Sequence, residues 1–450
     1  MLISELYKLY NQHPVITTDS RVCPAGSIFF ALKGESFDGN SFAGKALQAG
    51  CAYAVIDDAS FCTGNRYILV DDVLTTLQQL AGMHRNTLGI PVIGITGTNG
   101  KTTTKELTAA VLSKKYNTLY TEGNLNNHIG VPLTLLRLTR KHEIAVIEMG
   151  ANHPGEIRYL ANIARPDFGL ITNVGYAHLE GFGSFEGVVR TKGELYDFVR
   201  NTGGKIFINT GNEYLNEIAG GLELIKYGVA TDFKTPGKEL FVSGKVLNRN
   251  PFLSFAWQQQ GKGSQHSVET HLVGDYNLWN VLAAITIGAY FDIVPEQINS
   301  AIANYVPSNN RSQLMKTAKN TLIIDAYNAN PSSMRAALEN FASPHSGDSR
   351  TKPSITIFES LQKVAILGDM LELGEKSPEL HADIVRLAET LEIDKILLCG
   401  EQFSTVGKKH TCFRSVEELS KFLNENPLHS CHILIKGSHG VHLEKIIDKL

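Results

Sequence analysis

Residues Pro91–Lys105, PVIGITGTNGKTTTK, contain the pattern that decides the fold. The apolar run Val92–Ile95 predicts a buried strand, and the residues from Lys101 to about Lys115 predict a helix. A glycine-rich turn between a strand and a helix leaves backbone N–H groups free, and the positive end of the helix dipole adds to them. The turn therefore suits a phosphate chain.

The side chains of this turn fit the same role. Lys101 can reach the outer phosphates of a nucleotide, and the Thr102 hydroxyl can ligate Mg²⁺. Only two residues separate Gly97 from Gly100, fewer than in the usual P-loop, so the turn is a variant. A tight turn without a ligand rarely combines glycine, lysine and hydroxyls. The nucleotide-binding residues expected here are Gly97, Thr98, Asn99, Gly100, Lys101, Thr102 and Thr103.

Length and composition limit the classes of protein. The chain has 450 residues, which suggests about three domains. Charged residues make up 19% and the net charge is −3, so we expect no nucleic acid partner and no membrane insertion. The six cysteines form no C-x-x-C pair, which argues against a disulfide framework or a zinc site. Without a signal-peptide pattern or an apolar run of about 20 residues, the expected location is the cytoplasm.

Residues 1–87 predict a small N-terminal α/β domain. Arg21, beside Ser20 in a polar loop, could hold an anionic ligand or could be a structural turn residue. The expected strands and helices are Ser27–Leu32, Phe42–Ala49, Ala52–Ile56 and Leu74–Arg85.

Residues 88–311 predict a parallel sheet with helices on both faces, because strands and helices alternate. Ligands of such sheets lie outside the carboxyl ends of the strands. The glycine-rich turn, Glu148 and His178 all fall at such ends, so we expect them to share one site. The expected strands are Val92–Ile95, Ile144–Ile147, Gly169–Val174 and Lys205–Asn209.

Spacing alone leaves two interpretations for each side chain near this site. Glu148 could ligate Mg²⁺, which prefers carboxylate and phosphate oxygens, or could be solvated at a strand end. A single histidine such as His178 is more often a satisfied polar residue than a metal ligand. Lys192, in a predicted helix, would ordinarily be an exposed helical lysine.

Residues 240–273 change character and predict antiparallel hairpins added to the parallel sheet. The helix Val281–Tyr290 follows them. Asn277 and Asn280 could share a helix face and read a purine edge, although asparagine near a helix start is as often a cap. The short strand-like runs are Leu240–Leu247, Phe252–Trp257 and Ser267–Leu272.

Residues 312–450 predict a second doubly wound α/β domain. Polar segments follow three of its strands at one sheet edge, which predicts a second half-site. These segments are Asp325–Pro331, Gly368–Gly374 and Lys436–Gly440. Ser343–Ser354 predicts a surface loop. The expected strands are Thr321–Ile324, Val364–Leu367, Lys395–Leu398 and His432–Ile435.

Eight segments carry a resemblance to a known family: GITGTNGKTTTKE (Gly94–Glu106), GNLNNHIGVPLTLL (Gly123–Leu136), IEMGANHPGEI (Ile147–Ile157), TNVGYAHLEGFGS (Thr172–Ser184), TKGEL (Thr191–Leu195), DAYNANPSSM (Asp325–Met334), LGDMLELG (Leu367–Gly374) and LIKGSHG (Leu434–Gly440). Together they resemble the Mur ligases of peptidoglycan synthesis over essentially the whole chain. The resemblance implies an N-terminal UDP-binding domain, a central P-loop ATPase domain with appended antiparallel strands, and a C-terminal Rossmann-like domain that binds the incoming group.

Variants within these motifs narrow the resemblance. GANHPGEI, AHLEGFGS and DAYNANPSSM resemble the branch that joins D-alanyl-D-alanine to UDP-N-acetylmuramoyl-tripeptide, and no DNPR-like motif is present. The resemblance implies ATP and a pair of Mg²⁺ ions, an acyl-phosphate intermediate, closure of three domains near residues 85–90 and 310–315, and a monomer. The nearest alternative is another ligase of the same family, adding a different amino acid or making polyglutamate. A nucleotide switch without ligase activity is the alternative from another class.

The resemblance also implies roles for particular residues. Thr102, Glu148, His178 and a carbamylated Lys192 would serve the metals, and Lys101 the phosphates. Asn277 and Asn280 would lie near adenine, with Arg311 and Asp325 on the far side of the nucleotide. The residues expected to contact UDP-N-acetylmuramoyl-tripeptide or the dipeptide are Ser20, Arg21, Asn126, Asn127, Tyr327, Asn328, Asn330, Ser333 and Lys436.

Three departures from the family pattern stand out. His439 replaces the arginine of the usual Lys-Gly-Ser-Arg motif, and an imidazole is not equivalent to a guanidinium at an anion site. Asn40 stands where an N-terminal DGH-like motif has histidine. The segment Ser343–Gln362 is longer than usual.

Overall fold

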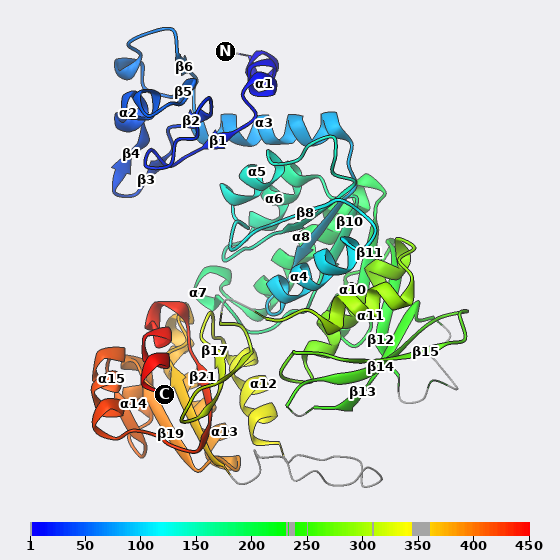
Figure 1. The fold of residues 1–450 in the computed structure, drawn as a ribbon, viewed down its shortest axis with the longest axis vertical. Coiled ribbons are helices and arrows are strands. Elements are labelled where there is room, and N and C mark those ends of the chain that lie inside the picture. Colours follow the sequence, from blue (N-terminus) through cyan, green and yellow to red (C-terminus); the bar gives the residue numbers. More distant parts are fainter. Residues whose placement is uncertain (1, 231–232, 234–238, 250, 308–309, 344–360) are drawn as a thin grey trace.

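The computed structural model describes residues 2–230, 233, 239–249, 251–307, 310–343 and 361–450 (Figure 1). They form sheets of four, nine and six strands, which follow one another along the chain, and a two-stranded ribbon of β3 (Lys33–Gly34) and β4 (Phe37–Asp38). The predicted α/β class with three sheet-centred units is confirmed. None of the helices in the described residues has the length and apolar character that crossing a membrane requires.

The N-terminal sheet is parallel throughout, in the order β1-β2-β5-β6. Its strands are β1 (Ile16–Thr17), β2 (Ile28–Phe30), β5 (Tyr53–Ile56) and β6 (Tyr67–Leu69). The helices of this part are α1 (Ile3–Gln12), α2 (Ala43–Gln48) and α3 (Val73–Leu88), with the short turns η1 (Gly39–Phe42) and η2 (Ala59–Phe61).

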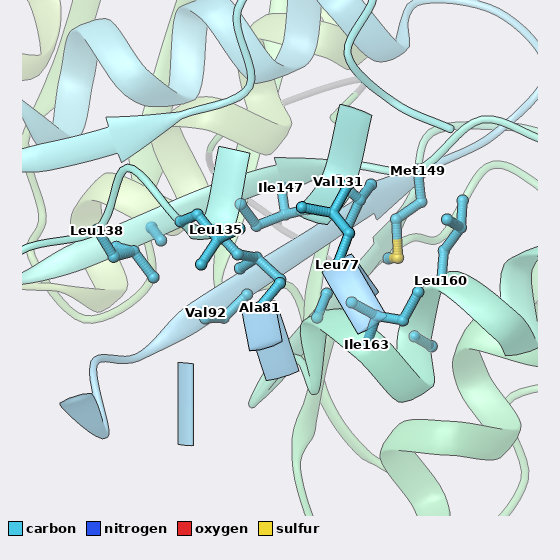
Figure 2. Close-up of a cluster of buried hydrophobic side chains, with 14 of the residues drawn as sticks. Leu77, Ala81, Val92, Val131, Leu135, Leu138, Ile147, Met149, Leu160 and Ile163 are labelled. Carbon is cyan, nitrogen blue, oxygen red and sulfur yellow. The ribbon is translucent and has the colours of Figure 1, made fainter. Parts of the chain in front are cut away.

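Helix α3 joins the N-terminal sheet to the central one and is bonded to the central part. The Gln78 amide donates to the carbonyl of His128 at 2.9 Å. Arg85 pairs with Asp167 at 2.7 Å and is itself buried. Figure 2 shows Leu77 of α3 inside the apolar cluster of the central sheet.

The central sheet has the order β15-β14-β13-β12-β11-β10-β7-β9-β8. Strands β13 to β8 of this order run parallel, and β14 and β15 are antiparallel additions, which confirms the predicted hairpins. The strands are β7 (Val92–Thr96), β8 (Thr118–Tyr120), β9 (Ile144–Glu148), β10 (Phe168–Ile171), β11 (Lys205–Asn209), β12 (Glu223–Val229), β13 (Val242–Asn248), β14 (Ser254–Gln259) and β15 (Gln265–Glu269).

Helices cover both faces of this sheet, as predicted. One apolar cluster joins the sheet to α3, α5, α6 and α8, and another joins it to α4, α10 and α11. The helices are α4 (Lys101–Leu112), α5 (Gly130–Leu135), α6 (Glu156–Ala164), α7 (Leu179–Phe182), α8 (Phe185–Thr202), α9 (Glu213–Glu217), α10 (Asn277–Tyr290) and α11 (Pro295–Ala303).

The C-terminal sheet has the order β16-β17-β21-β18-β19-β20, with only β16 antiparallel. Its strands are β16 (Gln313–Lys316), β17 (Thr321–Asp325), β18 (Gln362–Gly368), β19 (Lys395–Cys399), β20 (Thr411–Phe413) and β21 (Cys431–Lys436). The helices are α12 (Pro331–Ala342), α13 (Ser377–Thr390), α14 (Glu401–Val406) and α15 (Val416–Glu425), with the turns η3 (Gly374–Lys376), η4 (His439–Val441) and η5 (Leu443–Lys449).

Several strands were not predicted, among them the seven-residue β12 and the shorter β8, β16 and β20. Strands β8 and β20 have three residues each, too few to show a period in the sequence. The predicted surface loop at Ser343–Ser354, and the longer segment to Gln362, lie almost wholly outside the described residues.

Candidate active site

The glycine-rich turn has the geometry of a phosphate-binding loop. Strand β7 ends at Thr96, and α4 begins at Lys101 with Gly100 as its N-cap at φ 75°. A Cβ on Gly100 would lie 2.5 Å from Oδ1 of Asn280, and one on Gly97, at φ 142°, would lie 2.0 Å from Oγ1 of Thr172. Both positions therefore require glycine. The strand and the start of the helix are as predicted, although the helix ends at Leu112.

Side chains just after β10, the strand beside β7 in the sheet, hold this loop in place. The Asn99 N–H donates to Oδ1 of Asn173, and the Asn173 amide donates back to the Asn99 carbonyl, both at 3.0 Å. Thr172 also donates to the Asn99 carbonyl, at 2.7 Å. We did not assign Thr172 or Asn173 a role from the sequence, although both lie in the TNVGYAHLEGFGS motif.

Lys101 lies on the inner side of the loop. Its Nζ donates to the carbonyls of Gly97 at 2.8 Å and Thr98 at 3.1 Å. Burial lowers the pKa of the Lys101 amine; the Glu148 carboxylate opposes this shift and the Arg311 guanidinium adds to it. An ammonium group with poor solvation gains from a phosphate anion placed beside it.

Glu148 is a buried carboxylate with one open oxygen. Its Oε1 accepts from Thr102 at 3.3 Å and from the Asn126 amide at 2.8 Å. Its Oε2 has no hydrogen-bond partner among the described residues, and Nζ of Lys105 is 4.0 Å away. A hydroxyl and a carboxylate oxygen without a hydrogen bond, beside a phosphate loop, fit Mg²⁺. Within the described residues no group of three or more His, Cys, Asp and Glu could hold a metal, so a Mg²⁺ ion here would depend on phosphate oxygens and water as well.

Lys192 is not an exposed helical lysine, which corrects the interpretation from its helix position alone. Its side chain is only 2% exposed, and Nζ donates to the Ala151 carbonyl at 3.1 Å. Nζ also lies 5.0 Å from the ring centre of Phe182. Burial lowers the pKa of the Lys192 amine well below its usual range, and the charge of Lys101 adds to this shift.

Glu194, which we did not predict, positions the loop beside Lys192. Its carboxylate accepts from the N–H groups of Gly155 and Arg158, both at 2.9 Å, and so caps α6 from the neighbouring helix α8. A signal existed in the TKGEL motif, where Glu194 follows Lys192 by two residues.

His178 projects from a strained backbone position at φ 49°. Its Nδ1 forms an ion pair with Oε2 of Glu372, which belongs to the C-terminal domain. The His178 imidazole holds the pKa of the Glu372 carboxyl below its usual range. The structure therefore brings His178 to the cavity wall but turns it towards a residue that we did not assign from the sequence.

Asn277 and Asn280 share a face of α10, as predicted. The Asn280 amide donates to Oδ1 of Asn277 at 2.8 Å, and Oδ1 of Asn280 accepts from Thr104 at 3.1 Å. The Asn277 amide donates to the Val273 carbonyl at 2.8 Å. These bonds tie the start of α10 to the first turns of α4, beside the phosphate loop.

The C-terminal sheet presents a cationic and aromatic edge. Lys436 is buried, and its Nζ lies 2.5 Å from Oδ2 of Asp325 and 3.2 Å from the Asn328 carbonyl. Arg311 stacks on the ring of Tyr327 at 3.8 Å. The predicted polar edge of the second sheet is present.

His439 and Asn330 complete the C-terminal side. His439, which departs from the family pattern, stacks on Tyr327 with ring centres 5.9 Å apart. The Asn330 amide crosses to the central domain and donates to Oδ1 of Asn99 at 2.8 Å. Ser333 and Asn330 together form the capping box of α12.

These groups surround one cavity of about 980 Å³ between the central and C-terminal domains. The predicted site residues that line it are Thr98, Asn99, Gly100, Lys101, Thr102, Thr103, Asn126, Asn127, Glu148, His178, Asn277, Asn280, Arg311, Asp325, Tyr327, Asn328, Ser333 and Lys436. The predicted site residues outside its lining are Ser20, Arg21, Gly97, Lys192 and Asn330. Sequence reasoning missed Asn209 and Trp279, which also line it.

The N-terminal residues are placed separately from this cavity. Arg21 is exposed and paired with Asp19 at 2.7 Å, and this contact lowers the pKa of Asp19 to about 2. Asn40 is buried, and its amide donates at 2.8 Å to both Asp38 and Asp57. Asn40 therefore has a structural role in this chain, whatever a histidine does at its position elsewhere.

A phosphate loop at the carboxyl edge of a parallel sheet, facing the polar edge of a second α/β domain across one cavity, defines a nucleotide-dependent enzyme that works between domains. The chain belongs to the Mur ligase family. Residues 14–92 match the model of the Mur ligase family catalytic domain, residues 95–288 the Mur ligase middle domain, and residues 310–438 the Mur ligase glutamate ligase domain.

Individual relatives agree with this family. The UDP-N-acetylmuramoyl-tripeptide–D-alanyl-D-alanine ligase of Bacillus subtilis (strain 168) is 36% identical, over 97% of this chain and 92% of its own length. MurF from Acinetobacter baumannii is similar in structure, with a TM-score of 0.83, 30% identity and coverage of 97% and 92% of the two chains. The MurF ligase from Thermotoga maritima, solved in complex with ADP, has a TM-score of 0.81, 25% identity and coverage of 97% and 96%. The resemblance seen in the motifs is confirmed.

Proposed function

We propose that this chain joins D-alanyl-D-alanine to UDP-N-acetylmuramoyl-tripeptide in an ATP-driven reaction that forms an amide bond. The observation that carries the proposal is the shared cavity, which has the phosphate loop on one wall and the Asp325–Lys436 edge on the other. The activity is that named for the relatives. Because ATP and UDP-linked precursors are cytoplasmic metabolites, we also propose that the chain works in the cytoplasm, as a monomer.

The proposed reaction has two steps. An oxygen of the tripeptide carboxylate attacks the γ-phosphorus of ATP, which gives an acyl phosphate and releases ADP. The amine of the dipeptide then attacks the acyl carbon, an amide bond forms, and inorganic phosphate leaves with the bonding electron pair. The amine loses a proton in this second step, and solvent or phosphate can accept it.

The chain's own residues must offset the repulsion between two anions, the carboxylate and the γ-phosphate. Lys101 and the free N–H groups at the start of α4 provide positive charge on the ATP side. Arg311 and Lys436 line the opposite wall of the cavity. Most of the rate enhancement would come from this positioning and charge stabilisation.

Thr102 and Glu148 are the residues that would hold Mg²⁺, with His178 and Lys192 as neighbours for a second ion. When bound, Mg²⁺ supplies positive charge to the phosphate oxygens. The Asn126 amide donates to Glu148 and so orients that carboxylate. Because Asn126 also lines the cavity, it could contact the muramyl peptide at the same time.

Lys192 would become a metal ligand only as a carbamate. Its lowered pKa favours the neutral amine, which is the form that adds to CO₂. Carbamylation replaces a buried cation by an anionic oxygen donor, which would relieve the repulsion from Lys101. The proposal therefore gives a chemical reason for a lysine in a buried place beside another cation.

A panel of incoming groups tests the function. Phosphate release should require ATP, UDP-N-acetylmuramoyl-tripeptide and D-alanyl-D-alanine together. L-alanine, D-glutamate, lysine and diaminopimelate should give rates at background. Preference for one of these amino acids would indicate a different Mur ligase, and ATP hydrolysis that no incoming group stimulates would favour a nucleotide switch.

A further inference from the structure

The LGDMLELG motif, Leu367–Gly374, has no role in the proposed chemistry, yet buried groups fix its backbone. The Met370 N–H donates to Nε2 of His381, and the Leu371 N–H donates to Oγ of Ser438, both at 3.0 Å. His381 and Ser438 are themselves buried. The residue after this pinned pair, Glu372, is therefore presented in a defined direction.

Asp369 fixes the start of the same segment. Its carboxylate oxygens accept from the N–H groups of Gln402 and Phe403, both at 2.9 Å, at the start of α14. Because Asp369 bonds α14 and the next residues bond α13 and the last loop, the segment is tied to three parts of the C-terminal domain.

The Glu372 side chain of the C-terminal domain contacts His178 of the central domain. Both residues have left-handed backbone conformations, at φ 62° and φ 49°, which non-glycine residues rarely adopt. Such positions persist only where the surroundings impose them, and they gather at functional sites. Here the two meet at an ion pair on the wall of the candidate active site.

The ion pair lies within a wider contact between the two domains. The Glu180 N–H donates to the Glu372 carbonyl at 3.3 Å, and Gly374 packs on Glu180. Leu380 of α13 packs against the cluster that includes Leu179 and Phe182 of α7. Since Nζ of Lys192 lies over the Phe182 ring, this contact reaches Lys192 as well as His178.

The pair is too exposed to serve stability alone. The Glu372 side chain is 52% exposed and that of His178 is 25% exposed. Ion pairs with this degree of exposure contribute little to folding. The unfavourable backbone conformations of both residues are better explained by a role in orienting the two side chains than by a contribution to stability.

We propose that Glu372 is a positioning residue that fixes the His178 ring. The orientation of His178 then depends on how the C-terminal domain packs against the central domain. The expected effect of Glu372 on catalysis rests on the proposed function. The expected effect on the orientation of the His178 ring does not, because the Glu372–His178 contact is present without any substrate.

The experiment compares Glu372→Gln with Glu375→Gln in the full chain. Glu375 is an exposed acidic residue just after this segment, three positions beyond Glu372. Imidazole ¹H–¹⁵N spectra are recorded without substrate, and the His178 signals are identified by their absence from His178→Gln protein. Glu372→Gln should move the His178 signals, Glu375→Gln should leave them in place, and unchanged signals in Glu372→Gln would overturn the proposal.

Kinetics supply a second readout. In Glu372→Gln we expect kcat to fall about tenfold with the KM for D-alanyl-D-alanine within threefold, and a melting temperature unchanged. Glu372→Asp should recover part of the rate, and Glu375→Gln should match the wild type. A wild-type kcat in Glu372→Gln would contradict the proposal. If the wild-type chain itself shows no phosphate release that depends on the dipeptide, the proposed function is refuted, and the His178 spectra alone decide the present inference.

Discussion

At Lys192 the surroundings decide the chemistry more than the residue type does. We predict that Lys192→Ala lowers turnover at least 100-fold, the order expected when a stabilising charge is lost from an active site. Bicarbonate with a short carboxylic acid such as acetate should restore part of the rate, because the acid can occupy the space and supply the missing oxygen. Phosphate release measured with and without these additives checks this.

Lys192→Arg is the matched control for this prediction. It keeps the positive charge, cannot form the carbamate and leaves no room for the acid, so neither additive should restore it. Full turnover in Lys192→Ala without additives would refute the carbamate assignment.

Single residues differed in how far the sequence could predict them. Lys101 and Thr102 were predictable because their roles depend on the local spacing of a turn. Lys192 was not, since its burial comes from Ala151 and Phe182, which belong to other elements. Glu372 was missed for the same reason: its partner His178 lies in another domain.

At the scale of elements, the segment after β18 depends on one neutral histidine. His381 is fully buried; its Nε2 accepts the Met370 N–H, and its Nδ1 lies 2.7 Å from the Ser377 carbonyl, to which it must donate. A proton on Nε2 would abolish the bond to Met370. Burial lowers the pKa of His381, against opposing effects of the Ser377 carbonyl and the Asp369 charge.

This arrangement predicts an acid-sensitive contribution to stability. The unfolded chain binds a proton at His381 below about pH 6.5, while the folded chain resists it, so the free energy of unfolding should fall as pH decreases below that value. His381→Gln should cost about 1–3 kcal/mol at pH 8. The cost should shrink between pH 6.5 and 5, because the variant has no proton to bind.

Urea unfolding of both proteins across this pH range tests the prediction. Other buried histidines, such as His84, contribute equally to both proteins and cancel in the difference. A difference between the two free energies that does not change with pH would contradict the prediction.

Most of the secondary structure was predictable, and the shortest exceptions have a physical cause. Strands such as β7 and β9, with five residues each, are buried on both faces and read as apolar runs. Strands β8 and β20, with three residues each, owe their conformation to pairing with β9 and β19. No pattern within so short a segment can predict its partner.

For the whole molecule, the proposed reaction would require the substrates assigned to the three domains to meet. We predict that an ATP analogue together with UDP-N-acetylmuramoyl-tripeptide reduces the radius of gyration, because the N-terminal domain must approach the cavity. The sequence suggested a pivot near residues 85–90, but the bonds of Gln78 and Arg85 to the central domain favour a pivot before Val73. Small-angle scattering with and without the ligands checks the closure, and identical profiles would count against it.

Helix α3 has a consequence for attempts to exchange the first domain between relatives. Along the chain it ends the N-terminal part, but its apolar face, with Leu77 and Ala81, covers Leu135 and Leu160 of the central part (Figure 2). Each such leucine loses about 1.5–3 kcal/mol when it returns to water. A hybrid joined at residue 88 would therefore pack a foreign α3 against this surface of the central part. A junction before Val73 would exchange the N-terminal sheet and keep the native α3 packed on the central part.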